Sequence, residues 1–131
     1  LVVAAKERQW MLVRRLADAR ANLEAKATED TKTVLSLVTE ALQWETTVHL
    51  AKRGADLNSR GDAGKTALFC AVDCGQDDVV QCLLQRKADP NAPDDNGDSP
   101  MLRACNRQLE HVMRSLFDGG ASIDDAVKRA S

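Results

Sequence analysis

The sequence predicts an all-α fold in which short helical pairs stack into a solenoid. The chain repeats itself, because Ala55-Asp56 recurs as Ala88-Asp89, an offset of 33 residues. Within one period, apolar residues follow helical spacing, and Pro, Asn, Asp and Gly gather between the helical stretches. A unit of this size cannot bury its apolar faces alone, so neighbouring units must stack to form the core.

Four units are predicted along the single domain 1–131. Near the N-terminus the offset becomes 34 residues, since Gln9-Trp10 corresponds to Gln43-Trp44, and the first unit is the least regular. The predicted units span about 1–29, 30–61, 62–94 and 95–127. We expect the chain to be part of a larger protein, because it begins at Leu1 and stops at Ser131 among charged residues.

The third unit shows the helical pair most clearly. Thr66 is suited to cap a first helix and Gly75 to end it. A second helix is predicted over about 77–86, where two acidic residues lie in the first turn and the apolar residues share one face. Turn residues follow at 88–91.

These motifs resemble the ankyrin repeat. The third unit carries Thr66-Ala67-Leu68 at the start of the first helix, Gly75 between the helices and Ala88-Asp89-Pro90-Asn91 in the turn. The similarity covers essentially the whole chain. It implies an ankyrin-repeat solenoid of helix-turn-helix units joined by hairpin loops.

The sequence also departs from the family pattern. The first-helix His of the family is replaced by Ser36, Phe69 and Leu102, so its bonds to neighbouring loops are not expected. Lys87 stands where the family has Gly. Lys87 must therefore adopt a left-handed backbone or reshape the loop, at a cost of about 1 kcal/mol.

Composition excludes several classes of protein. A formal net charge of −2 argues against a general nucleic-acid binder. Aromatic residues make up 3% of the chain and Tyr is absent, which leaves little surface for stacking on bases. No apolar run reaches the roughly 18 to 20 residues of a membrane span. We therefore expect a monomer in the cytoplasm, with the nucleus as an alternative.

No catalytic or metal-binding motif is found. The four cysteines contain no CxxC pair, and reduced thiols are expected. Gly64-Lys65-Thr66 has the ending of a phosphate-binding loop, but Ser59 stands where that loop needs Gly. We expect no enzyme activity, no cofactor and no metal.

By the repeat register, the cysteines differ in environment. Cys70, Cys82 and Cys105 are expected to act as small core residues, whereas Cys74 should face solvent. His49 is expected at an inward position of a second helix, without catalytic partners.

The resemblance implies that loop tips and the exposed side of the first helices bind another protein. Acidic residues become more frequent in the loops toward the C-terminus, which favours a partner with a basic or hydrogen-bonding segment. The alternative is that the turn residues Asp94, Asp95 and Asp98 serve only solubility. The predicted partner-binding residues are Asp30, Lys32, Glu40, Arg60, Asp62, Lys65, Asp73, Cys74, Asp95, Asn96, Asp98, Asn106 and Arg107.

Two further residue pairs recur at equivalent positions. Asn58 and Asn91 occupy the hairpin position that resembles a substrate of asparaginyl hydroxylase, although bonding within their own loop is the favoured interpretation. Trp10 and Trp44 precede second helices, where covering the edge of the core is favoured over an exposed binding site.

The predicted function is that of a protein-interaction module within a signalling or scaffolding protein. Recruitment of a substrate for a linked catalytic domain is compatible with the same residues. The alternative is a stand-alone enzyme inhibitor that resembles the four-repeat ankyrin inhibitors of cyclin-dependent kinases.

Overall fold

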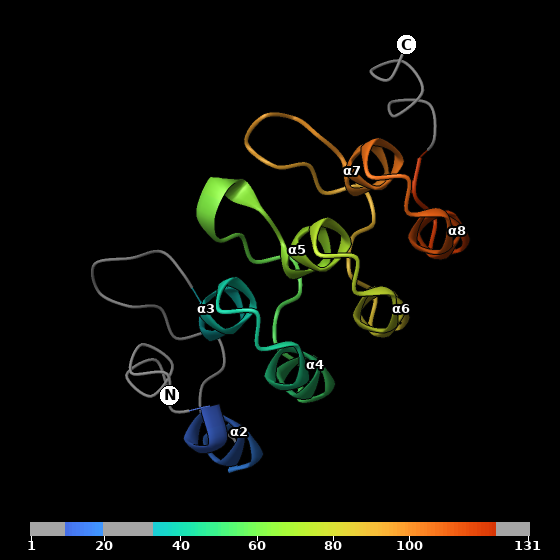
Figure 1. The fold of residues 1–131 in the computed structure, drawn as a ribbon. Coiled ribbons are helices and arrows are strands. Elements are labelled where there is room, and N and C mark those ends of the chain that lie inside the picture. The colour runs from blue at the N-terminus through green and yellow to red at the C-terminus, as the bar shows by residue number, and fades with distance from the viewer. Residues whose placement is uncertain (1–9, 20–32, 123–131) are drawn as a thin grey trace.

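The computed structural model describes residues 10–19 and 33–122, and its helices lie in two parallel rows (Figure 1). One row contains α2 (Trp10–Asp18), α4 (Trp44–Lys52), α6 (Asp77–Gln85) and α8 (Glu110–Asp118). The other row contains α3 (Val34–Glu40), α5 (Ala67–Asp73) and α7 (Pro100–Asn106), with a short 3-10 helix, η1 (Asp62–Gly64), in the loop before α5. The described residues form no β-strand, and the predicted all-α solenoid is confirmed.

Each helix of the second row begins with the same capping interaction. Thr33, Thr66 and Ser99 each accept a hydrogen bond through the side-chain oxygen from the backbone N–H three residues later, at 3.3, 3.2 and 3.1 Å. Such a cap satisfies one of the backbone donors that a helix start leaves unpaired. The predicted cap at Thr66 is therefore confirmed.

Left-handed residues separate the helices at regular positions. Leu42, Gly75 and Gln108 have φ of 60°, 68° and 57° in the turns between the two helices of a pair. Lys87 has φ of 66° after α6, so it adopts the left-handed backbone, one of the two outcomes expected at this position. Only Gly adopts this backbone without steric cost, so the non-glycine residues are strained.

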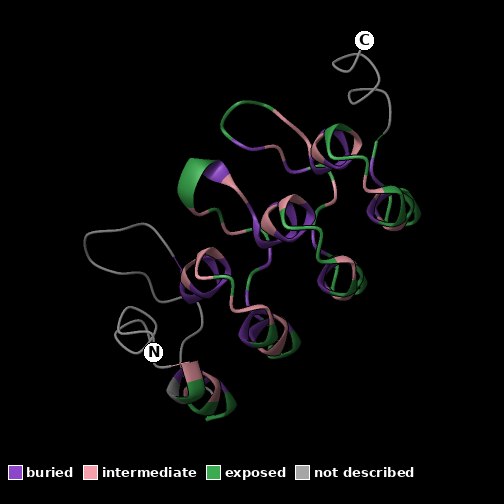
Figure 2. Cartoon of the chain, in the orientation of Figure 1, coloured by how far each residue is buried: buried purple, intermediate pink, exposed green. Residues whose placement is uncertain are grey.

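The core lies between the two rows and continues along the whole stack (Figure 2). Leu50, Leu83 and Leu116 occupy equivalent places in α4, α6 and α8, and all three are fully buried. Along the stack, α3 packs on α5 and α5 on α7, while α2, α4, α6 and α8 pack in sequence. Each unit thus covers the apolar surface of its neighbour, as the solenoid architecture requires.

Side-chain hydrogen bonds connect successive turns. The Asn58 Oδ1 atom accepts from the Asp89 N–H at 3.1 Å, and the Asn91 Oδ1 atom accepts from the Ser122 N–H at 2.7 Å. Each asparagine also bonds within its own loop, as expected, but through its backbone N–H, which donates to the carboxylate of Asp56 or Asp89. Hydroxylation of Asn58 and Asn91 stays a prediction.

The burial of the cysteines and tryptophans agrees with the sequence prediction except at three cysteines. Cys74 is exposed as expected, but Cys70, Cys82 and Cys105 are half-buried rather than enclosed in the core. Trp10 and Trp44 are half-buried and pack against the core, as the favoured interpretation predicted.

None of the described helices combines the length and the apolar character that crossing a bilayer requires.

Candidate functional site

The first-helix face is the side of the stack formed by α3, α5, α7 and the two finger loops, residues 59–65 and 92–98 (Figure 1). Asp30 and Lys32, both predicted to bind a partner, lie outside the described residues. The other predicted residues lie on this face and are exposed or half-buried. The exposed ones are Arg60, Asp62, Cys74, Asp95, Asn96, Asn106 and Arg107, and the half-buried ones are Glu40, Lys65, Asp73 and Asp98.

Glu40 anchors the first finger loop. Its Oε1 atom accepts a hydrogen bond of 2.7 Å from the Asp62 N–H, and its side chain lies directly over Gly61. A side chain at position 61 would collide with this carboxylate. Glu40 at the end of α3 therefore holds the loop that precedes α5.

The second finger is organised by a buried acid. Asp94 is 4% exposed, and its Oδ1 atom accepts from the N–H groups of Asn96 and Asp98 at 3.0 and 2.9 Å. The interpretation of Asp94 as a solubilising turn residue is wrong. A short acidic side chain can satisfy backbone donors of its own turn, and here that local bonding keeps the carboxylate buried.

The two fingers are joined to each other. The Asp95 N–H donates to the Ala63 carbonyl at 2.9 Å, and the Asp95 carboxylate packs over Gly64. Ala63 and Gly64 have φ of 57° and 71°, which turns the first finger toward the second. The fingers thus form one continuous edge of the face.

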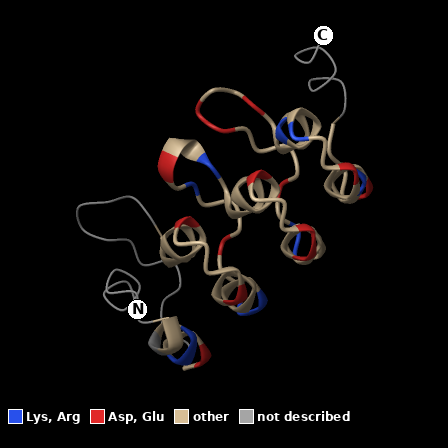
Figure 3. Ribbon diagram, in the orientation of Figure 1, with Lys and Arg blue, Asp and Glu red and all other residues tan. Residues whose placement is uncertain are grey.

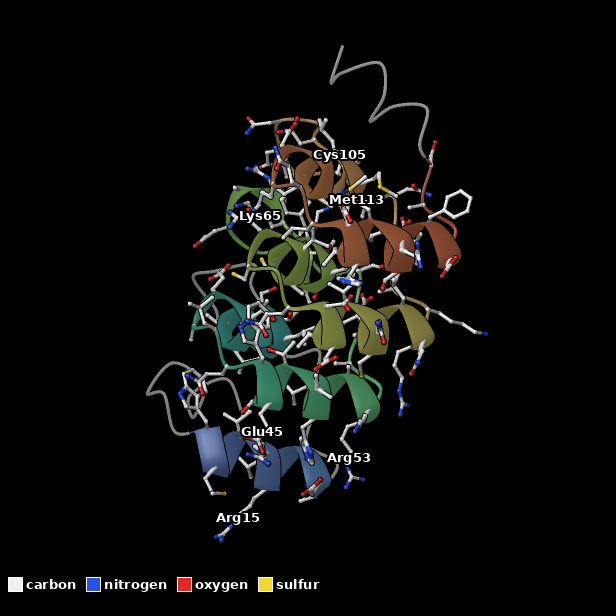
Figure 4. All side chains as sticks on the ribbon, turned by 45° about the vertical axis from the view of Figure 1, so that its right-hand side comes forward. Arg15, Glu45, Arg53, Lys65, Cys105 and Met113 are labelled. Carbon is white, nitrogen blue, oxygen red and sulfur yellow. The ribbon has the colours of Figure 1, made fainter. Side chains whose placement is uncertain are left out.

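Three cations from two units surround Asp73. Lys65 Nζ lies 3.5 Å from Asp73 Oδ2, while Arg103 Nε and Arg107 Nη1 lie 3.7 and 3.5 Å from Oδ1. We call these four residues the Asp73 cluster. Figure 3 shows acidic residues on both fingers and basic residues on the first finger and on α7, and Figure 4 shows Lys65 on the finger side of the stack.

Phe69 lies beneath this cluster. Its side chain is fully buried, with Lys65 Nζ 5.6 Å and Arg103 Cζ 5.5 Å from the ring centroid. A cation at this distance over an aromatic ring is attracted by the negative face of the π system. Phe69, which replaces the family's His, therefore positions two of the three cations.

The sequence prediction included Lys65, Asp73 and Arg107 but missed Arg103 and Phe69. Arg103 lies one helical turn before Arg107, so the two arginines share a face of α7. Likewise Lys65, Phe69 and Asp73 are spaced by four residues. This spacing was the signal available in the sequence, but the meeting of the two sets depends on packing of α5 against α7.

A second ionic group lies on the opposite side of the stack. The Asp18 Oδ1 atom is 2.9 Å from His49 Nε2 and 2.6 Å from Arg53 Nη2. The hydrogen bond from His49 and the charge of Arg53 lower the pKa of the Asp18 carboxyl against a smaller effect of desolvation. The expected inward position of His49 is wrong, because His49 is half-exposed and joins α4 to α2.

Known proteins with related sequences share this helical-repeat fold. The family described as ankyrin repeats (3 copies) matches residues 1–94 and 40–127. The chain belongs to the ankyrin repeat family. Ankyrin repeats are protein–protein interaction modules, and the family is not a catalytic one.

Individual relatives cover only part of this ankyrin chain. Ankyrin repeat domain-containing protein 63 of Homo sapiens is 39% identical over 79 residues, which is 57% of this chain and 21% of that protein. A putative ankyrin repeat-containing protein of Treponema pallidum (strain Nichols) is 34% identical over 90 residues, 68% of this chain and 30% of that protein.

A third relative is the human protein phosphatase 1 regulatory subunit 27. It is 41% identical over 51 residues, 39% of this chain and 33% of that protein. The chain thus spans between about a fifth and a third of the length of these three relatives.

Proposed function

We propose that this chain binds a partner protein through the first-helix face, as a recruitment or scaffolding module. The observation that carries the proposal is the arrangement of charged residues from successive units on this face. Glu40 joins α3 to the first finger, Asp95 joins the two fingers, and the Asp73 cluster joins α5 to α7. A partner laid along the face would meet side chains from three units at once.

The face offers both signs of charge. Asp62 and Asp95 lie on the fingers, the first of which also carries Lys65, whereas Arg103 lies on α7 and Arg107 directly follows it. Complementary charges on a partner speed its encounter and fix its register more than they raise its affinity. The fingers suit a basic or hydrogen-bonding segment, as predicted from the sequence.

The test is affinity capture from a cell lysate with two charge variants of equal net charge. The first carries Cys74→Glu, Asn106→Glu and Arg107→Glu, all exposed on the first-helix face. The control carries Lys52→Glu and Arg114→Glu, both exposed on the second-helix row. Circular dichroism checks that both variants are folded.

A partner retained by the wild type and the control but lost by the first variant supports the proposal. Equal capture by all three proteins contradicts it, because binding would then use another surface. Size-exclusion chromatography with light scattering tests the proposed monomer, and imaging of the tagged chain tests the proposed cytoplasmic location.

A regulatory role is a second candidate within the same class. Two relatives are named as regulators, the phosphatase subunit above and NF-kappa-B inhibitor delta of Mus musculus, 35% identical over 68 residues, which is 52% of this chain and 21% of that protein. If the captured partner is an enzyme or a transcription factor, its activity with and without the purified chain separates a regulator from a passive scaffold.

A further inference from the structure

The Asp73 cluster contains more positive than negative charge. One carboxylate faces three cations that come from a finger loop, from α7 and from the residue that ends α7. The contacts are long, at 3.5 to 3.7 Å, whereas charge-assisted hydrogen bonds are typically about 2.7 to 2.9 Å. Asp73 therefore does not saturate the donors around it.

Arg103 is the clearest case of a donor that lacks an acceptor. Its Nε atom is buried and has no hydrogen-bond acceptor within the described residues. A buried polar donor without an acceptor costs free energy, and a guanidinium offers five N–H groups in a planar fork that fits a carboxylate. The Arg103 side chain as a whole is 30% exposed, so an acceptor from outside can reach the exposed part of the side chain, although not the buried Nε atom itself.

The cations are held in place before any partner binds. Lys65 and Arg103 both lie over the Phe69 ring, and α5 packs directly on α7. Side chains that are already ordered lose less conformational entropy on binding. Two other acids of this face have roles in the fold, since Glu40 accepts from the Asp62 N–H and Asp94 accepts from backbone N–H groups of its own turn.

We infer that the Asp73 cluster receives an acidic side chain, Asp or Glu, from the partner protein. The partner's carboxylate would lie beside Arg103 and Arg107 and supply the acceptors that Asp73 leaves unfilled. The cluster already holds one carboxylate between the same donors, which indicates the chemistry it fits. This inference rests on the proposed function and adds the chemistry of one contact.

The test measures binding of fluorescein-labelled peptides by anisotropy at low salt. The probe is a short peptide in which Glu alternates with Gly and Ser, and matched peptides carry Lys or Gln in place of Glu. The protein is the full 131-residue chain. The variants are Arg103→Gln and Arg107→Gln, with Arg86→Gln as the control, because Arg86 is exposed at the end of α6 and makes only backbone hydrogen bonds to residues within 10–19 and 33–122.

We expect the Glu peptide to bind about tenfold more tightly than the Lys or Gln peptide, and binding to weaken as salt screens the charges. Arg103→Gln and Arg107→Gln should each weaken binding about fivefold or more, while Arg86→Gln changes it less than about twofold. Arg107 is half-exposed, so its variant remains informative if Arg103→Gln unfolds the chain.

Equal binding of the three peptides, or equal weakening by Arg86→Gln, would overturn the inference. The proposed function is separable from this result. If the Glu peptide fails to bind but the first-helix charge variant still loses its captured partner, the binding face stands and only the acidic contact is wrong. If the first-helix charge variant also captures the same partner as the wild type, both the proposed binding face and the acidic contact are wrong.

Discussion

The Asn58 side chain bonds to the backbone of Asp89, a residue that begins the equivalent turn one unit later, at 3.1 Å. Asn91 repeats this contact with Ser122 at 2.7 Å and also donates through Nδ2 to the Gly120 carbonyl at 3.4 Å. The turns are therefore connected through side chains as well as through the chain itself.

Replacing Asn58 or Asn91 with Ala should lower the free energy of unfolding by about 1 kcal/mol or more each, because Asn58 loses one hydrogen bond between turns and Asn91 loses two. Urea denaturation followed by circular dichroism measures the change. Asn106→Ala is the control, since Asn106 is exposed at the end of α7, and it should stay within about 0.5 kcal/mol of the wild type. An equal loss in all three variants would contradict the role of the turn contacts.

Gly64→Ala should be strongly destabilising, by about 2 kcal/mol, because two costs combine. The backbone at Gly64 has φ of 71°, and an added Cβ would collide with the Asp95 carboxylate. Gly54→Ala provides a matched control, with φ of 91° and no atom of the described residues within 4 Å of the added Cβ. Thermal denaturation should show a clearly smaller loss for Gly54→Ala, and similar losses would show that the finger contact is unimportant.

Lys87→Gly should stabilise the protein by about 1 kcal/mol, because it relieves the left-handed strain of a side-chain-bearing residue. Arg114→Gly is the opposite control. It places Gly at an exposed site inside α8, where the lost helix propensity costs about 1 kcal/mol. Guanidinium denaturation of the two variants should give changes of opposite sign, and a loss of stability in Lys87→Gly would refute the strain.

Asp18 should give the stability a dependence on acid pH. Its pKa is lowered below the usual 3.8, so the stabilisation is fully present above that value and is lost as the pH falls through the lower folded-state pKa. Asp18→Asn should reduce the stability at pH 7 and flatten its decline below about pH 4. Urea titrations at several pH values measure both effects.

Asp78→Asn is the control for this pH dependence. Asp78 is exposed in the first turn of α6 and makes no ion pair within residues 10–19 and 33–122. If its pH profile changes as much as that of Asp18→Asn, the contact with His49 and Arg53 is not the cause.

Alkylating reagents should modify Cys74 well before Cys70. Burial raises the pKa of the Cys70 thiol to about 11, so little thiolate is present at pH 8, whereas Cys74 is exposed. Mass spectrometry of iodoacetamide-treated protein gives the order of modification. Cys74→Ser should remove the earliest product, and rapid labelling of Cys70 in that variant would contradict its assigned environment.

The architecture could be predicted because the same local chemistry recurs in every unit. The capping residues Thr33, Thr66 and Ser99 and the buried leucines 50, 83 and 116 each keep a spacing of 33 residues. Helix starts, turns and core positions could therefore be identified from the sequence alone. The same register placed Lys87 at a left-handed position but left open whether the residue would adopt that backbone or reshape the loop.

The candidate site could be predicted only in part, because its decisive contacts cross between units. Asp73 and Arg107 appear in the sequence as exposed positions, but nothing local shows that they face each other with Arg103. Asp94 looked like a solvated turn residue, since its burial depends on the fold of the whole finger. His49 pairs with Asp18 through the packing of α4 on α2, which periodicity alone does not reveal.

The bond from the Asp95 N–H to the Ala63 carbonyl has a mechanical consequence. Two loops that share a backbone hydrogen bond bend together, so the paired fingers are stiffer than two separate loops would be. A partner that pushes against one finger also displaces the other. Deformation at this edge is therefore transmitted across two units of the stack rather than absorbed by one.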